Sequence, residues 1–166
     1  MKKRNVVFIL ALMIGFTQFT GCLNAGTQDT GQVDIKAGIL PQVLSPEETL
    51  KIYLNAFISR DIDTAMAYLP NGAGKQITAW RERMKAINQV YMSEKKHVIA
   101  VESINLIKIE TLDTGKSAII EATIVTTPKF SGAVSCDQQG KCTASLQWTF
   151  RQYKQDGPWL YDGGGF

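Results

Sequence analysis

Ser117-Ala118-Ile119-Ile120-Glu121-Ala122-Thr123-Ile124 decides the fold, because its residues alternate between an apolar set and a wetter set. The apolar set consists of Ala118, Ile120, Ala122 and Ile124. The same period of two returns in Ala144, Leu146, Trp148 and Phe150. Successive side chains point to opposite faces of a strand, so both segments are predicted to be strands with one buried face. Two such faces require a second layer of structure to cover them.

Helical signals precede these strands, and the strongest is Ser45-Pro46-Glu47-Glu48. A capping Ser, a Pro at the first helical position and a Glu three residues after the Ser form a capping box. Apolar residues follow at helical spacing: Leu50, Tyr53, Leu54, Phe57 and Ile58. A short helix capped by Asp61 is predicted to run to Tyr68. A third, amphipathic helix is predicted from Ile77 to Met92, with one apolar face made of Ile77, Trp80, Met84, Ile87 and Tyr91.

The stretch Val98 to Leu112 is also strand-like, but its apolar residues do not keep a period of two. The residues that break the alternation are Ile104, Leu106, Ile107 and Ile109. They predict a bulge that bends the strand. Asp113-Thr114-Gly115 and Asp156-Gly157 predict turns between neighbouring antiparallel strands. Helices followed by antiparallel strands predict an α+β fold, with the N-terminal helices packed on one face of a curved sheet.

Four short motifs lie between Ser45 and Tyr161. They are Pro46-Glu47-Glu48, Tyr53-Leu54-Asn55-Ala56-Phe57, Asp61-Ile62-Asp63-Thr64-Ala65 and Asp156-Gly157-Pro158-Trp159-Leu160. Together they resemble the pattern of bacterial lipoproteins with a nuclear-transport-factor-two-like, or cystatin-like, domain. The resemblance implies helices packed in the concavity of a bent sheet, in the shape of a cone. The same cone serves ketosteroid isomerases, dehydratases, secretion-complex parts and binding modules, so it does not imply one function.

The start of the chain has the order of an export signal. The basic residues Lys2, Lys3 and Arg4 precede eleven apolar residues, Val6 to Phe16, whereas a membrane-spanning helix needs about 20. Phe19-Thr20-Gly21-Cys22 follows and resembles the bacterial lipobox, which implies cleavage before Cys22 and acylation of its sulfur with fatty acids such as palmitate. Two or more acyl chains hold a protein on a membrane. The alternative is an ordinary signal cut near Ala25, which gives a soluble secreted protein.

The predicted organisation has three parts. Residues 1–21 are the lipoprotein signal peptide, residues 22–44 a polar tether, and residues 45–166 a single α+β domain that is long enough to bury a core. The lipid anchor places the protein in the bacterial cell envelope. Leu23 stands where an inner-membrane retention signal carries Asp, which implies the outer membrane, facing the periplasm, in a cell with two membranes.

The positive charge of the full chain comes from its signal. The chain has 18 Lys and Arg against 15 Asp and Glu, and removal of Lys2, Lys3 and Arg4 leaves 15 of each sign. Proteins that bind nucleic acid usually have a strong net positive field. The composition therefore speaks against nucleic acid as a partner.

Three cysteines leave an odd thiol in an exported protein unless one of them is otherwise used. Acylation of Cys22 leaves Cys136 and Cys142 as an even pair in an oxidising compartment. Five residues, with Gly140 near their end, separate the two. We expect a disulfide that ties the tip of a hairpin, rather than a redox pair.

Residues that carry chemistry are sparse. His97 is the single histidine, no zinc-ligand spacing can be built around it, and we expect neither a metal nor a cofactor. Five aromatic residues are candidates for the lining of a pocket, although their spacing is also typical of a core: Tyr53, Phe57, Trp80, Tyr91 and Trp148.

Two functions remain open at this level. The favoured one is a non-catalytic binding or assembly module on a lipid anchor, with a protein partner or an apolar small ligand. The alternative is an enzyme of the ketosteroid-isomerase type, in which Glu102 or Glu110 points into the cone as a general base and acts with a tyrosine such as Tyr53. Edge strands also leave a homodimer open.

We predict that the mature chain begins at Cys22 and that this residue is acylated. The basis is the order of basic cluster, short apolar run and lipobox-like residues. Mass spectrometry of the mature amino end, on protein extracted from the envelope, checks the prediction. An unmodified terminus at or beyond Ala25 would contradict it.

Overall fold

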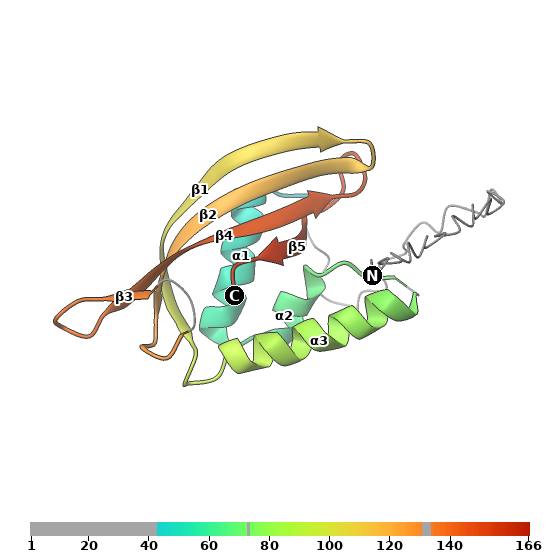
Figure 1. The fold of residues 1–166 in the computed structure, drawn as a ribbon. Helices are drawn as coiled ribbons and strands as arrows, with labels where there is room; N and C mark the ends of the chain where they lie inside the picture. The colour runs from blue at the N-terminus through green and yellow to red at the C-terminus, as the bar shows by residue number, and fades with distance from the viewer. Residues whose placement is uncertain (1–42, 73, 131–133) are drawn as a thin grey trace, which may run out of the picture.

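The computed structural model describes residues 43–72, 74–130 and 134–166, and the predicted signal peptide and most of the predicted tether lie outside them. The elements in these ranges are α1 (Pro46–Ser59), α2 (Ile62–Ala67), α3 (Lys75–Tyr91), β1 (Val98–Leu112), β2 (Gly115–Thr126), β3 (Val134–Cys136), β4 (Cys142–Gln152) and β5 (Leu160–Gly164). Helices therefore precede strands, as predicted (Figure 1). Within the described ranges, no helix has both the length and the apolar character that crossing a membrane requires.

The capping box of α1 is present as predicted. The hydroxyl oxygen of Ser45 accepts a hydrogen bond from the backbone N–H of Glu48 at 3.2 Å, and the Glu48 carboxylate accepts one from the N–H of Ser45 at 3.0 Å. Both groups would otherwise leave backbone donors unpaired at the helix start. The helix ends at Arg60, whose backbone is left-handed with φ of 59°. The fixed start orients the apolar stripe of α1 toward the sheet.

β2 and β4 are the central pair of a five-stranded antiparallel sheet. The strand order is β1-β2-β4-β3, and β5 also pairs with β4. Ala118 lies opposite Phe150, and Ile120 lies opposite Trp148. Cross-strand partners point to the same face of a sheet, so the two alternating apolar sets form one continuous surface. These residues are fully buried, as the alternation predicts.

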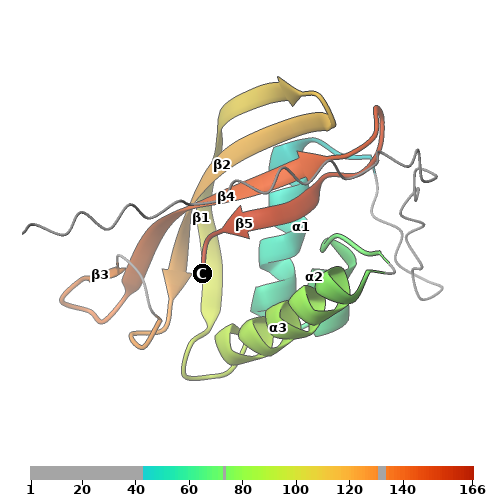
Figure 2. The ribbon, with the colours of Figure 1, turned by 45° about the vertical axis from the view of Figure 1, so that its right-hand side comes forward.

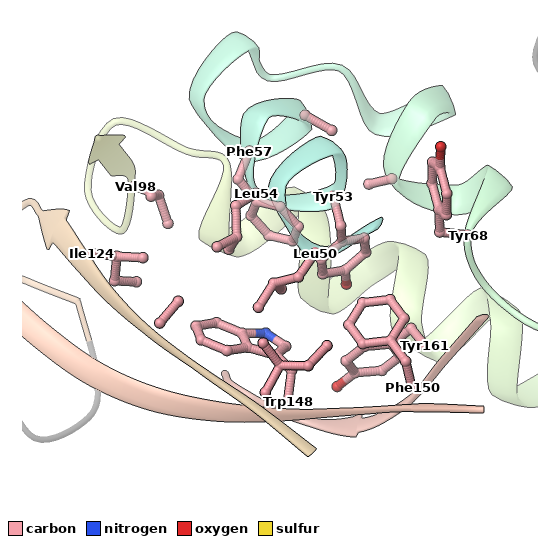
Figure 3. Close-up of a cluster of buried hydrophobic side chains, with 14 of the residues drawn as sticks. Leu50, Tyr53, Leu54, Phe57, Tyr68, Val98, Ile124, Trp148, Phe150 and Tyr161 are labelled. Carbon is pink, nitrogen blue, oxygen red and sulfur yellow. The ribbon is translucent and has the colours of Figure 1, made fainter. Parts of the chain in front are cut away.

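The sheet is curved, and α1 lies in its concavity, with α2 and α3 on the open side (Figures 1 and 2). Leu50, Tyr53, Leu54 and Phe57 extend from α1 toward the sheet, where Trp148 and Phe150 face them (Figure 3). Full burial of a large apolar side chain contributes about 1.5–3 kcal/mol relative to leaving it exposed. The predicted α+β class, with helices in the concavity of an antiparallel sheet, is confirmed.

The predicted bulge in β1 is also present. The register between β1 and β2 shifts at three places, one of them between Leu106 and Lys108. A bulge bends a strand and increases its local twist, which supports the curvature of the sheet. In the outer part of β1, residues 105–111 are all exposed.

Helix α3 differs from the prediction in where it starts and in how far its apolar face is buried. It starts at Lys75 rather than Ile77, and its predicted apolar face is only partly covered. Its one buried residue is Asn88. The reason is that α3 is attached chiefly to α2: the Arg81 guanidinium donates to the backbone oxygens of Met66, Leu69 and Pro70 at 2.9 to 3.3 Å. Desolvation lowers the pKa of Arg81, while these oxygens satisfy its donors.

The predicted disulfide joins Cys136 to Cys142 with an S–S distance of 2.04 Å. The two cysteines are cross-strand partners on β3 and β4. Asp137 closes the turn between them, because its carboxylate accepts hydrogen bonds from the backbone N–H groups of Gln139 and Lys141 at 3.0 and 2.8 Å. The hairpin tip is therefore held by side-chain hydrogen bonds as well as by the covalent bond.

We predict that the double substitution C136S/C142S lowers the free energy of unfolding by about 2 kcal/mol and leaves the fold intact. A ring this small restricts the unfolded chain only modestly. Denaturant unfolding of the oxidised parent and the double variant measures the difference. An unfolded double variant, or free thiols in protein purified without reductant, would contradict the prediction.

Candidate functional site

The ring of Phe166 lies among four aromatic rings that come from four separate segments. Its centroid is 4.6 Å from that of Phe57, 4.8 Å from Tyr91, 5.4 Å from Phe130 and 5.8 Å from Trp148. These distances fall in the range of favourable aromatic pairs. We call Phe57, Tyr91, Phe130 and Trp148 the aromatic cage.

Different elements hold the members of the cage in place. Phe57 lies near the end of α1, Tyr91 is the last residue of α3, and Trp148 lies on β4. Phe130 follows β2, and its backbone N–H donates to the oxygen of Thr127 at 3.0 Å. Two hydrogen bonds join Thr127 to His97. The Thr127 N–H donates to the backbone oxygen of His97 at 2.9 Å, and the His97 N–H donates to the hydroxyl oxygen of Thr127 at 3.0 Å. The cage is therefore assembled only when the helices, the sheet and this loop are in place.

The backbone before Phe166 passes close to the edge of Trp148. Gly165 donates its N–H to the backbone oxygen of Gln147 at 2.7 Å, and the Tyr161 hydroxyl donates to the oxygen of Gly164 at 2.8 Å. Gly165 has a φ of 74°, and a Cβ atom there would lie 2.1 Å from Nε1 of Trp148. Only glycine allows this approach. The ring of Phe166 can enter the cage because the residue before it has no side chain.

Several polar atoms are buried in the core without a hydrogen-bond partner. The carboxamide of Asn88 is fully buried, and neither its nitrogen nor its oxygen has a hydrogen-bond partner of good geometry. The indole N–H of Trp148 is also buried without a hydrogen-bond partner. The Tyr53 hydroxyl lies next to Asn88, at a geometry too poor to satisfy either group. A buried polar group without a partner costs about 1–3 kcal/mol, so these atoms are a second unusual feature of this region.

Tyr53 is not suited to act as a base or as an anion here. Burial raises the pKa of its phenol far above the ordinary value, and the nearby Tyr161 raises it further. The hydroxyl therefore stays protonated across the physiological range and can act only as a neutral donor or acceptor.

The structure brings together three of the five aromatic residues proposed from the sequence. Phe57, Tyr91 and Trp148 surround Phe166. Tyr53 points to the other side of the core, where it stacks on Tyr161 with centroids 5.4 Å apart. Trp80 is half-buried on α3 and has no ring contact with the cage among the described residues.

Sequence reasoning missed Phe130, Phe166 and Asn88. Phe130 lies outside any regular element, and a polar residue on a helix is normally assigned to solvent. Phe166 could have been noticed from the glycines that precede it, Gly163, Gly164 and Gly165, because a glycine run allows close backbone approach.

The hypothesis that Glu102 or Glu110 points into the cone is wrong for both residues. Each is exposed on β1. Glu102 forms an ion pair with Lys141 at the hairpin tip, and Glu110 forms one with Lys108 on its own strand. Val101 and Ile104 pack against the core on either side of Glu102, and a register shift lies between Val101 and Ser103, so Glu102 itself stays exposed. Glu110 lies in the outer part of β1, where residues 105–111 are all exposed.

Comparisons with known proteins show a likeness in fold only. No protein-family model matches the sequence, and no curated protein matches it either. A solved structure described as an uncharacterized protein with a cystatin-like fold, from Caulobacter vibrioides, is similar to 70% of this chain and 82% of its own. The two are 13% identical with a TM-score of 0.38. We draw no functional conclusion from a likeness of this size.

We predict that G165A lowers stability because it expels the Phe166 ring from the cage. The added methyl group would collide with Trp148, so G165A should cost about as much as F166A, roughly 2 kcal/mol for a half-buried ring. The double variant G165A/F166A should be no less stable than either single variant, because both lose the same contact. Thermal or denaturant unfolding of the three variants measures this.

G140A is the matched control. Gly140 has a φ of 80°, close to the 74° of Gly165, but a Cβ atom there would meet open space. G140A therefore reports the cost of the left-handed backbone without a collision. Costs of G165A and F166A that add in the double variant would show that Gly165 does not act through Phe166.

Proposed function

We propose that the protein is an envelope lipoprotein, anchored through Cys22, whose cone is a non-catalytic binding module for a group with an aromatic ring. The observation that carries this proposal is the aromatic cage around Phe166. We propose that the Phe166 ring is a displaceable occupant and that the aromatic part of a ligand or partner takes its place.

Three features support a binding role for the cage. The Phe166 ring is held by ring contacts. The glycine-rich segment before it is held by two hydrogen bonds, from the Gly165 N–H to the Gln147 oxygen and from the Tyr161 hydroxyl to the Gly164 oxygen. Helix α3, which contributes Tyr91, is incompletely covered on its apolar face. The indole N–H of Trp148, a member of the cage, is a buried polar group without a partner that a ligand could satisfy. Pockets that bind small molecules combine apolar walls with a few such polar groups.

The charge near the cage favours a ligand with some negative character. The Lys96 ammonium lies 5.4 Å from the centroid of the Tyr91 ring. A cation at this distance is attracted by the ring and places positive charge beside the cage. An aromatic ligand that carries an anionic group would contact both the rings and this charge.

The proposal contains no turnover chemistry. Both glutamates that could have served as a base are exposed and paired with lysines. His97 is outside the cage, and burial together with the nearby Arg60 lowers its pKa, which favours the neutral imidazole. These placements support a binding role over the isomerase alternative without testing it.

We predict that F166A raises the affinity of the mature chain for anilinonaphthalene sulfonate, an aromatic anion, at least tenfold. Removal of the Phe166 ring removes the competing occupant, and tenfold corresponds to about 1.4 kcal/mol. A fluorescence titration at constant salt measures both dissociation constants.

Y153A is the control, because Tyr153 is an exposed aromatic residue outside the cage. Y153A should bind the probe with the affinity of the parent chain. The double variant E102Q/E110Q, which removes the carboxylates of these two glutamates, should do the same. Equal affinity of the parent chain and F166A would contradict a displaceable ring. A rise in affinity of the same size in Y153A would show that the probe does not report on the cage.

A further inference from the structure

The exposed apolar residues of the domain gather on one strand. Among the described residues, eight large apolar side chains are exposed, and four of them belong to β1. These four are Ile99, Leu106, Ile107 and Ile109, which are 38% to 54% exposed. Among the described strands, β1 pairs with β2 alone and therefore lies at one edge of the sheet. A long edge strand with apolar side chains is a template for pairing with another strand.

The outer part of β1 is well formed despite its exposure. From Lys108 to Leu112 it keeps an unbroken antiparallel register with β2, in which Ile109 lies opposite Ala118 and Glu110 lies opposite Ser117. This segment therefore presents a regular backbone edge and not a frayed one. Its free edge can continue the sheet by one more strand.

The charges on this segment are suited to self-pairing. Lys108 and Glu110 lie two residues apart on one face of the strand, with Ile109 between them on the other face. When two copies of a strand pair antiparallel about a two-fold axis normal to the sheet, residues equally far from the axis lie opposite each other. An axis at Ile109 places Lys108 of each copy opposite Glu110 of the other.

The neighbouring registers are unfavourable. A two-fold axis at Lys108 places this lysine opposite itself, and an axis at Glu110 places two glutamates opposite each other. Opposite charges across a strand pair are stabilising and like charges are destabilising. The charge pattern therefore selects the register centred on Ile109, in which the two Ile109 side chains also meet.

We propose that β1 pairs antiparallel with β1 of a second copy of this chain, about a two-fold axis at Ile109. The two sheets then become one continuous sheet, and the exposed side chains on the outer part of β1 contact their cross-strand neighbours in the second copy. This interface is on a different strand from the aromatic cage and does not depend on the proposed ligand.

The register is tested by I109C in the full chain, oxidised mildly in the membrane fraction. Directly opposed residues of an antiparallel pair have Cα atoms about 4.5 to 5.5 Å apart, within the range of a disulfide. We expect I109C to form a crosslinked dimer, and I99C, equally exposed on β1 but far from the axis, to form none. Equal crosslinking of the two variants, or crosslinking of I109C only to other proteins, would overturn the proposal.

Charge-reversal variants distinguish the proposed contact of Lys108 and Glu110 between two chains from their ion pair within one chain. In the I109C background, K108E and E110K each place like charges across the axis, so each alone should lose most of the crosslinked dimer. A mixture of differently tagged K108E and E110K chains restores opposite charges across the axis, although each chain still lacks its own ion pair. The mixed dimer should therefore recover.

Recovery in the mixture is not expected from a role of the two residues within one chain. Both changes lie on exposed side chains, so the melting temperature of each variant should stay within a few degrees of that of the parent. A mixture that crosslinks no better than the single variants would overturn the proposed register.

Discussion

The contact between the stripe of α1 and the concave face of β2 and β4 is the constraint on which the rest of the structure depends. Tyr53 and Phe57 are fully buried against Trp148, Phe150 and their neighbours. Such burial is the dominant favourable term in folding. The sheet must curve to cover a single helix from more than one side, and the bulges of β1 contribute to that curvature. Curvature and core are thus two results of one packing requirement.

The same packing requirement explains which apolar surfaces stay incompletely buried. One helix fills the concavity, so α3 is attached to α2 through Arg81 and keeps its apolar face partly open. The space between α3 and the sheet receives the ring of Phe166. At the edge of the sheet, the outer part of β1 leaves Ile107 and Ile109 exposed to solvent. Both proposed binding surfaces lie where the central contact ends.

Local signals made much of the fold predictable. Ser45 and Glu48 predict the start of α1, because a capping box is formed by residues within one four-residue segment. The alternation of apolar residues in β2 predicts its buried face, because successive side chains of a strand point to opposite faces. Cys136 and Cys142 are separated by a length that suits a hairpin tip. The burial of Asn88 and the exposure of Glu102 were not predictable. The first depends on packing between elements, and the second on the exact position of a register shift between Val101 and Ser103.

The sequence by itself determined the class of the fold, the start of α1, the inward faces of β2 and β4 and the cysteine pair. Each of these follows from residues close together along the chain or from a repeated period. Only the tertiary structure decided that Phe57, Tyr91, Phe130 and Trp148 enclose Phe166, and that residues 105–111 of β1 stay exposed. The physical reason is that an aromatic cage assembled from four segments, and a strand left uncovered, are properties of packing over long separations, which no local pattern encodes.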